Sequence, residues 1–129
     1  MAADWRAWLY QKLSSDPAIT AEVGNRIYST LDMGPDEKPF LVIRLGESLS
    51  EVHSREGGES TTAVIWVDDD PGTYVNIDRI LKKIRTCLES GAMSGQQIQA
   101  IWQGDSQDLS DDARGTVVRN VTYRLVGRR

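Results

Sequence analysis

The chain has 129 residues and a net charge of −4, with 40% hydrophobic and 26% charged residues. This length suits one domain, residues 1–129, built around a single hydrophobic core. The acidic balance argues against a protein whose main task is to wrap nucleic acid, because such a protein neutralises phosphates with clustered lysine and arginine. The single cysteine, Cys87, excludes a disulfide framework, and we expect it to act as a small hydrophobic residue on a helix.

Two short helices are predicted at the start of the chain. Apolar residues recur at helical spacing over residues 4–13, with Asp4 as N-cap: Trp5, Trp8, Leu9 and Leu13. Asp16 and Pro17 are typical of the N-cap and first position of a second helix, which would end near residue 23. Apolar runs reach only about five residues, whereas a membrane-spanning helix needs roughly 20. The sequence therefore predicts no membrane association.

Three strands are predicted in the middle of the chain. A short one covers residues 27–29, and two longer apolar or β-branched ones cover residues 40–45 and 61–67. The polar stretch between them, residues 46–60, is interpreted as a long hairpin connection whose strand ends can extend further in an assembly.

The C-terminal half opens with the clearest amphipathic helix of the sequence, between Gly72 and Gly91. Its apolar stripe consists of Ile77, Ile80, Leu81, Ile84 and Leu88. A strand is predicted around residues 98–102, followed by a polar turn at 105–112. Residues 116–126 alternate as a half-buried strand does, with these residues on one face: Val117, Val121, Tyr123 and Leu125.

This order of elements predicts an α+β fold. We expect a mostly antiparallel sheet of about four to five strands, with an N-terminal helix and one long amphipathic helix packed on one face.

No catalytic residue, cofactor or metal site is predicted. The triple aspartate Asp68–Asp70 could bind Mg²⁺ with help from Glu47 or Glu59, but successive side chains on a strand point in opposite directions. The favoured interpretation is a strand end followed by a helix N-cap. His53 is the only histidine and has no second ligand at zinc spacing. We therefore expect a protein that is not an enzyme.

Arginines crowd the C-terminal end of an otherwise acidic chain: Arg114, Arg119, Arg124, Arg128 and Arg129. One interpretation is a solvated strand face with a frayed tail. The alternative is that this basic end contacts an acidic surface on another copy, as head-to-tail contacts in rings do. The four tryptophans are expected to lie mainly in the core, although Trp5 or Trp102 could be partly exposed and anchor a partner.

Two segments carry a resemblance to a known family. Leu13–Ile19 reads LSSDPAI and Val23–Tyr28 reads VGNRIY, which is similar to the opening of the tail-terminator (tail-completion) proteins of long-tailed bacteriophages. A proline-led strand at 38–43 and a β-branched strand at 61–67 follow in the family order. The chain departs from the family at Asp68–Asp70, where an aromatic-bearing segment is common.

The resemblance implies a structural virion protein located at the tail end near the neck and made in the host cytoplasm. Such proteins form a ring, commonly a hexamer, that caps the tail tube and presents the surface to which the head attaches. The implied partners are other copies of the chain, the tail-tube protein and head-side connector proteins, while DNA passes through the ring without specific binding. The alternatives are a head-side connector or other minor tail component, or an adaptor module outside phages.

The hypothesis for the contact between copies combines the 46–60 excursion with the basic C-terminal strand. Its residues are Glu51, His53, Arg55, Glu56, Arg114, Arg119 and Arg124.

Overall fold

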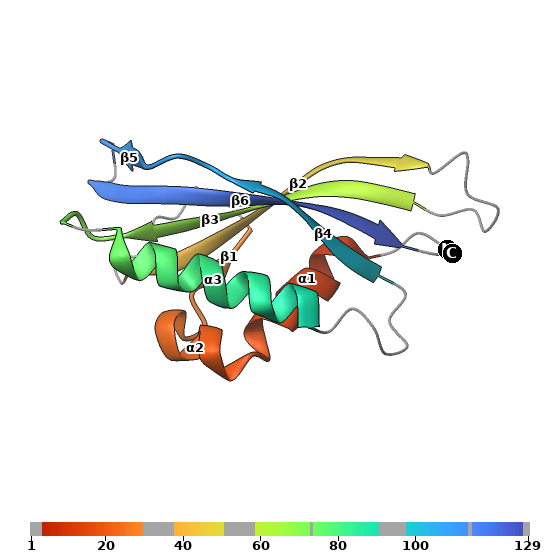
Figure 1. The fold of residues 1–129 in the computed structure, drawn as a ribbon, viewed down its shortest axis with the longest axis horizontal. Coiled ribbons are helices and arrows are strands. Elements are labelled where there is room, and N and C mark those ends of the chain that lie inside the picture. The colour runs from red at the N-terminus through yellow and green to blue at the C-terminus, as the bar shows by residue number, and fades with distance from the viewer. Residues whose placement is uncertain are drawn as a thin grey trace.

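The computed structural model describes residues 4–29, 38–50, 59–72, 74–90, 98–113 and 115–127, with the side chains of residues 47–50 and 90 outside that description. Three helices and six strands occur in these residues: α1 (Trp5–Ser14), α2 (Pro17–Val23), β1 (Ile27–Tyr28), β2 (Phe40–Ser50), β3 (Glu59–Asp69), α3 (Val75–Ser90), β4 (Ile98–Asp105), β5 (Leu109–Asp111) and β6 (Thr116–Gly127). The helices lie together on one side of the sheet (Figure 1). The α+β class is therefore confirmed.

The sheet has the strand order β1-β2-β3-β6-β4, with β5 also paired to β6. The pair β1–β2 is parallel and the other pairs are antiparallel. Two points of the expected fold were wrong: the sheet has six strands rather than four or five, and it is mixed rather than mostly antiparallel. The parallel pair joins Ile27 and Tyr28 of β1 to Leu41 and Val42 of β2. The helical layer consists of three helices rather than two.

The predicted caps of the first two helices are confirmed. The Asp4 side chain accepts a hydrogen bond of 3.0 Å from the backbone N–H of Ala7, and the Asp16 side chain accepts one of 2.8 Å from Ala18. Pro17 occupies the start of α2. Gly24 ends that helix with a φ of 59°, a left-handed conformation that a side chain would strain.

The core lies between the sheet and the helices. The predicted stripe of α3 is buried, with Ile77, Ile80 and Ile84 completely inaccessible. Three residues of β6 that were predicted to share one face belong to the same buried cluster as this stripe: Val121, Tyr123 and Leu125. Burial of these aliphatic side chains supplies most of the favourable free energy that stabilises a small domain.

The opposite face of the sheet carries no helix among the described residues (Figure 1). The register places Val42, Trp66 and Asn120 in one row across that face, and Arg44 beside Val64. Val42 is buried, Trp66 and Asn120 are partly buried, and Arg44 is exposed, so this face combines buried and accessible positions.

The polar excursion is shorter than its sequence suggested. Strands β2 and β3 stay paired out to Ser50 and Glu59, past an irregularity between Leu45 and Ser48. Residues 51–58 lie outside the described part of the chain. The predicted polar turn at 105–112 holds the short strand β5, which the sequence did not reveal. No described helix is long and apolar enough to cross a bilayer.

Candidate assembly surface

Arg119 connects three parts of the chain. Its Nε and Nη2 atoms donate to the backbone oxygen of Ser106, at 3.0 and 2.8 Å, and its Nη1 donates to Asp78 Oδ1 at 2.8 Å. Asp108 lies 3.7 Å away. The side chain is largely buried, with 21% of its surface exposed. Arg119 therefore stabilises the junction of β6, α3 and the turn before β5, and whether it also touches another copy stays a prediction.

Arg124 lies on the helix-free face of β6. The register places it beside Thr62 of β3 and Ile101 of β4, and it is exposed. It is thus in a position that a partner could reach. The other residues of the predicted contact fall outside the described part of the chain: Glu51, His53, Arg55, Glu56 and Arg114.

The triple aspartate divides between the two faces of the sheet. Asp68 lies on the helix-free face, where Thr116 Oγ1 donates to it at 3.3 Å. Asp69 points toward the helices, accepting from Asn76 Nδ2 at 3.2 Å and from the N–H of Asp70 at 2.8 Å. The two carboxylates therefore diverge and tie the end of β3 to β6 and to the first turn of α3. In the described residues no three acidic, histidine or cysteine side chains gather as a metal site would require.

Cys87 is buried in the core on α3, and its Sγ lies 3.4 Å from the backbone oxygen of Lys12. Burial raises the pKa of its thiol to about 12. Because the thiolate is the reactive form, this cysteine is inert at neutral pH. It acts as a hydrophobic residue, as the sequence suggested.

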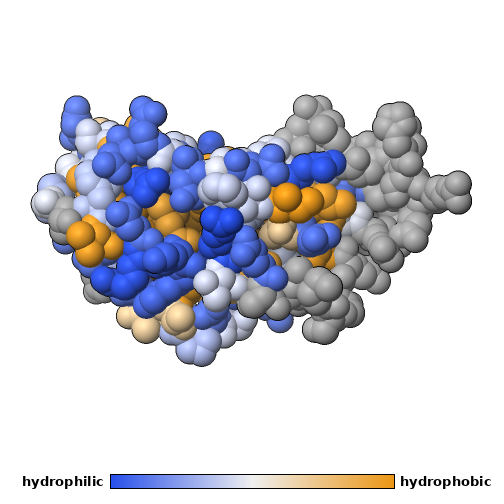
Figure 2. Space-filling model, viewed as in Figure 1, coloured by the Kyte–Doolittle hydropathy of each residue, from blue (hydrophilic) through white to orange (hydrophobic). Residues whose placement is uncertain are grey.

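The four tryptophans differ in exposure. Trp5 is in the core, and Trp8 and Trp66 are partly buried. Trp102 on β4 is more exposed: the guanidinium of Arg85 lies 4.1 Å from its ring centroid, and its Nε1 donates to Asp105 Oδ1 at 3.0 Å. Of the two tryptophans suggested as anchors, only Trp102 is accessible. Figure 2 shows a hydrophobic patch over β4, bordered by polar side chains.

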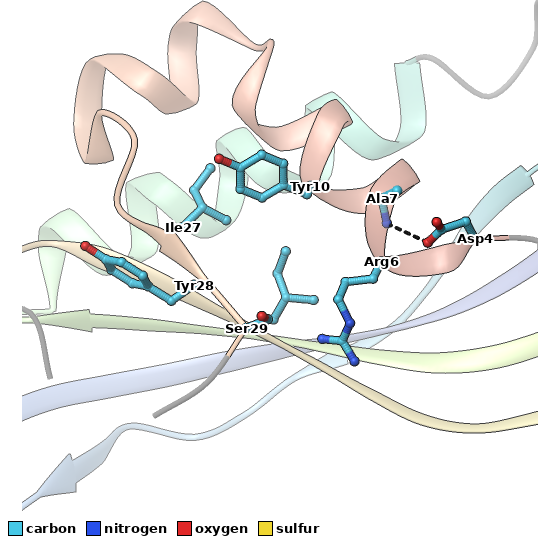
Figure 3. Close-up of a pocket in the computed structure, with 8 residues that line it drawn as sticks. Asp4, Arg6, Ala7, Tyr10, Ile27, Tyr28 and Ser29 are labelled. Atoms are coloured by element: carbon cyan, nitrogen blue, oxygen red, sulfur yellow. Dashed lines mark hydrogen bonds between the residues drawn. The ribbon is translucent and has the colours of Figure 1, made fainter. Parts of the chain in front are cut away.

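A pocket opens at the other edge of the sheet, between α1 and β1 (Figure 3). It has a volume of about 370 Å³, and its lining is mainly apolar. Ile27 and Ile43 belong to the buried cluster beneath it, while Tyr10 and Arg6 of α1 and Tyr28 of β1 surround the opening. Sequence reasoning missed this pocket, although Tyr10 stands off the apolar stripe of its helix.

A second pocket of about 370 Å³ lies on the helix-free face beside β5. Trp66, Leu109 and Val118 form its apolar wall, and its rim is acidic, with Asp68, Asp111 and Asp112. The sequence analysis did not predict it, because β5 was expected to be a turn.

Among the described residues, the geometry thus offers two pockets and exposed side chains on the sheet. None of the curated proteins compared with this chain matches it. A solved chain from the virion of a native gene transfer agent (GTA) particle has the same fold, with a TM-score of 0.77 and 14% sequence identity over 97% of this chain and 95% of that one. The family model of tail completion protein gp17 matches residues 7–127. This family consists of structural virion proteins rather than enzymes, and the chain belongs to it.

Proposed function

We propose that the chain forms a ring, commonly of six subunits in such proteins, that caps the tail tube and offers the attachment surface for the head. The family match over residues 7–127 carries this proposal, because it makes the chain a tail-completion protein. The fold shared with a chain of an assembled virion particle adds support. The tail-tube protein and head-side connector proteins are the expected neighbours.

The charge of the chain fits a channel through which DNA moves. A net charge of −4 disfavours a firm grip on phosphates, since such a grip depends on clustered cations. A cap that releases DNA quickly needs this weak interaction. The proposed ring is therefore a passage for DNA and not a DNA-binding site.

The hairpin of β2 and β3 is the proposed arm between subunits. The two strands remain paired out to Ser50 and Glu59, and residues 51–58 connect them in the sequence. Glu51, His53, Arg55 and Glu56 lie in that segment, and they would face Arg114, Arg119 or Arg124 of a neighbour. Opposite charges across such an interface fix the register of the partners.

Sedimentation and negative-stain imaging test the proposal directly. The purified chain, alone and mixed with tail tubes, should form rings that sit on tube ends. Deletion of residues 50–58 should abolish the ring, while replacement of the same residues by an equally long glycine-serine segment separates the effect of charge from that of length. Lone particles that never bind tubes would refute the function, and an unchanged oligomer mass after deletion would refute the arm.

A second binding experiment locates the ring within the virion. The proposed cap should bind isolated tail tubes more tightly than isolated DNA-filled heads. Preferential binding to heads would instead identify a head-side connector.

A further inference from the structure

We propose that Trp102 on β4 of one copy inserts into the pocket between α1 and β1 of the next copy, so that the sheets join head to tail. The inference deepens the proposed ring function and rests on it. It assigns the two sides of the contact between subunits to named residues.

The projecting side of the contact lies on β4. Four large hydrophobic side chains are exposed among the described residues: Tyr10 at 46%, Val75 at 62%, Ile101 at 38% and Trp102 at 36%. Two of the four are neighbours on β4, which is the last strand of the sheet order and pairs with no described strand on its outer side. Tryptophan is among the residues that contribute most when buried at an interface. The stacking of Trp102 on Arg85 holds the indole in one orientation before binding, which lowers the entropic cost.

The receiving side lies at the opposite edge of the sheet. Strand β1 pairs only with Leu41 and Val42, so the outer edge of β2 from Ile43 onward has no partner strand among the described residues. The pocket opens at this point, above Ile27 and Ile43 (Figure 3). Its volume of about 370 Å³ exceeds that of one indole ring system, and its apolar lining suits one.

The two sides lie in the same layer and at the same height. Trp102 lies on the helix-covered face of the sheet. Its cross-strand partner is Tyr123, and the partner of Tyr123 is Ala63, which lies on that same face. The pocket also lies in the helical layer, beside α1. Along the strands, Trp102 is level with Leu45, two residues from Ile43, or roughly 7 Å. A neighbouring copy therefore needs little shift along the strands to bring the two together.

Strand direction favours the same arrangement. Strand β2 is antiparallel to β3, β3 to β6, and β6 to β4, so β4 runs antiparallel to β2. Copies related by rotation about an axis along the strands keep these directions, and the free edges of β4 and β2 would meet as an antiparallel pair. Because the two edges belong to different parts of the chain, the contact is heterologous and can close into a ring.

Charge also matches across the contact. Arg6 and Asp4 line the pocket, while Asp105 accepts the indole N–H of Trp102 and the guanidinium of Arg85 lies over its ring, so each side carries one acidic and one basic group. Insertion of Trp102 would bring this carboxylate toward the guanidinium of Arg6. A carboxylate and a guanidinium form the strongest of the common side-chain pairs.

Removal of the anchor is the first test. Trp102→Ala should weaken the association constant of each contact by about thirtyfold, as loss of a central tryptophan does, and shift the protein toward monomer in sedimentation. Val75→Ala, which changes a more exposed hydrophobic residue at the start of α3, is the control and should leave the oligomer unchanged. Circular dichroism must show that both variants remain folded. Equal assembly of the two folded variants would overturn the inference.

Cross-linking tests the geometry while Trp102 is retained. Arg6→Cys and Gln103→Cys place thiols on the two sides of the contact, at opposite edges of one subunit. Under mild oxidation the double variant should give a ladder of multimers, and a mixture of the two single variants should give only dimers. Each single variant alone, like the parent chain with its buried Cys87, should give none.

The outcomes separate this inference from the proposed function. Rings that form without cross-links, or cross-links within one single variant alone, would overturn the head-to-tail contact and leave the ring intact. Failure to assemble in solution and on tail tubes would overturn both.

Discussion

The two faces of the sheet are built from the same strands but differ in how deeply their side chains are buried. On the helix-covered face, Leu41, Ile65 and Val121 are almost completely buried beneath the three helices. On the other face, Arg44, Val64 and Arg124 alternate with them and remain at least partly accessible. The difference teaches that the main core lies on the helix-covered face. Part of the other face is also buried, at Phe40, Val42 and Val118, whereas its accessible part, around Arg44 and Arg124, could take part in contacts with other proteins.

Substitution of adjacent residues on β3 gives the largest contrast between the faces. Ile65→Asp should lower the free energy of unfolding by more than about 4 kcal/mol, because it buries a carboxylate without a partner. Val64→Asp should cost less than about 1 kcal/mol, since its cross-strand neighbour is Arg44. Urea titration monitored by tryptophan fluorescence measures both. Similar losses would show that the helix-free face is also structural.

Truncation of a buried side chain on the helical side should have the next largest effect on stability. Ile84→Ala should lower the unfolding free energy by about 3 kcal/mol, because the side chain is fully buried against the sheet. Lys82→Ala, exposed on the same helix, should change it by less than about 0.5 kcal/mol. Thermal unfolding followed by circular dichroism compares them. Equal midpoints would contradict the assignment of the inner face of α3.

An ion-pair cluster connects α2 to α3. Glu22 Oε1 accepts from Arg79 Nη2 at 3.1 Å, and Glu22 Oε2 lies 3.3 Å from Lys83 Nζ. The hydrogen bonds from Arg79 are the main cause of a lowered pKa of the Glu22 carboxyl. Glu22→Gln should cost about 1 kcal/mol at neutral pH, because the Arg79 side chain is half exposed and solvent screens the pair.

The pH dependence of this loss follows from the direction of the shift. A carboxyl group with a lowered pKa in the folded state stabilises the protein above its ordinary value of 4.5 and loses that contribution as pH falls through the lowered value. The difference between parent and Glu22→Gln should therefore be constant from pH 5 to 7 and shrink below about pH 4. Denaturant titrations at several pH values measure it. A difference that grows on acidification would contradict the role of the Glu22 charge.

The smallest expected effect concerns the hydroxyl group of Tyr123. This residue is fully buried in the core, and within the described part of the chain its Oη has no hydrogen-bond partner. Burial accordingly raises the pKa of its phenol. Tyr123→Phe should raise the unfolding free energy by about 0.5 kcal/mol, because it removes a polar group that lost its water without compensation. A loss of stability would reveal a partner for the hydroxyl.

Local signals in the sequence predicted the elements that depend on short-range chemistry. Asp4 and Asp16 define helix starts by capping, and the apolar stripe of α3 gave its buried face. The alternation in β6 gave the correct inward residues. Each of these signals spans only a few positions, so it needs no knowledge of the rest of the chain.

The features that were missed depend on distant partners. The short strand β1 was predicted, but its parallel pairing with a segment 14 positions further on was not. Strand β5 was missed altogether, because it has three residues, too few for a periodic signal, and forms through its pairing with β6. The same limit applies to the surfaces: the contacts of Arg119 with Asp78 and Ser106, and the pocket beside Tyr10, arise only when the sheet brings separate segments together.

The position of β6 within the sheet has a consequence for how the chain folds. This strand lies between β3 and β4 and also holds β5, yet it follows all of them along the chain. Before β6 has been synthesised, β3 and β4 cannot be connected through it in one sheet. The hydrophobic side of α3 then lacks part of the sheet surface against which it packs. Pairings over such long sequence separations are slow to form. Completion of the sheet is therefore expected to be a late step of folding, which delays the appearance of assembly-competent subunits.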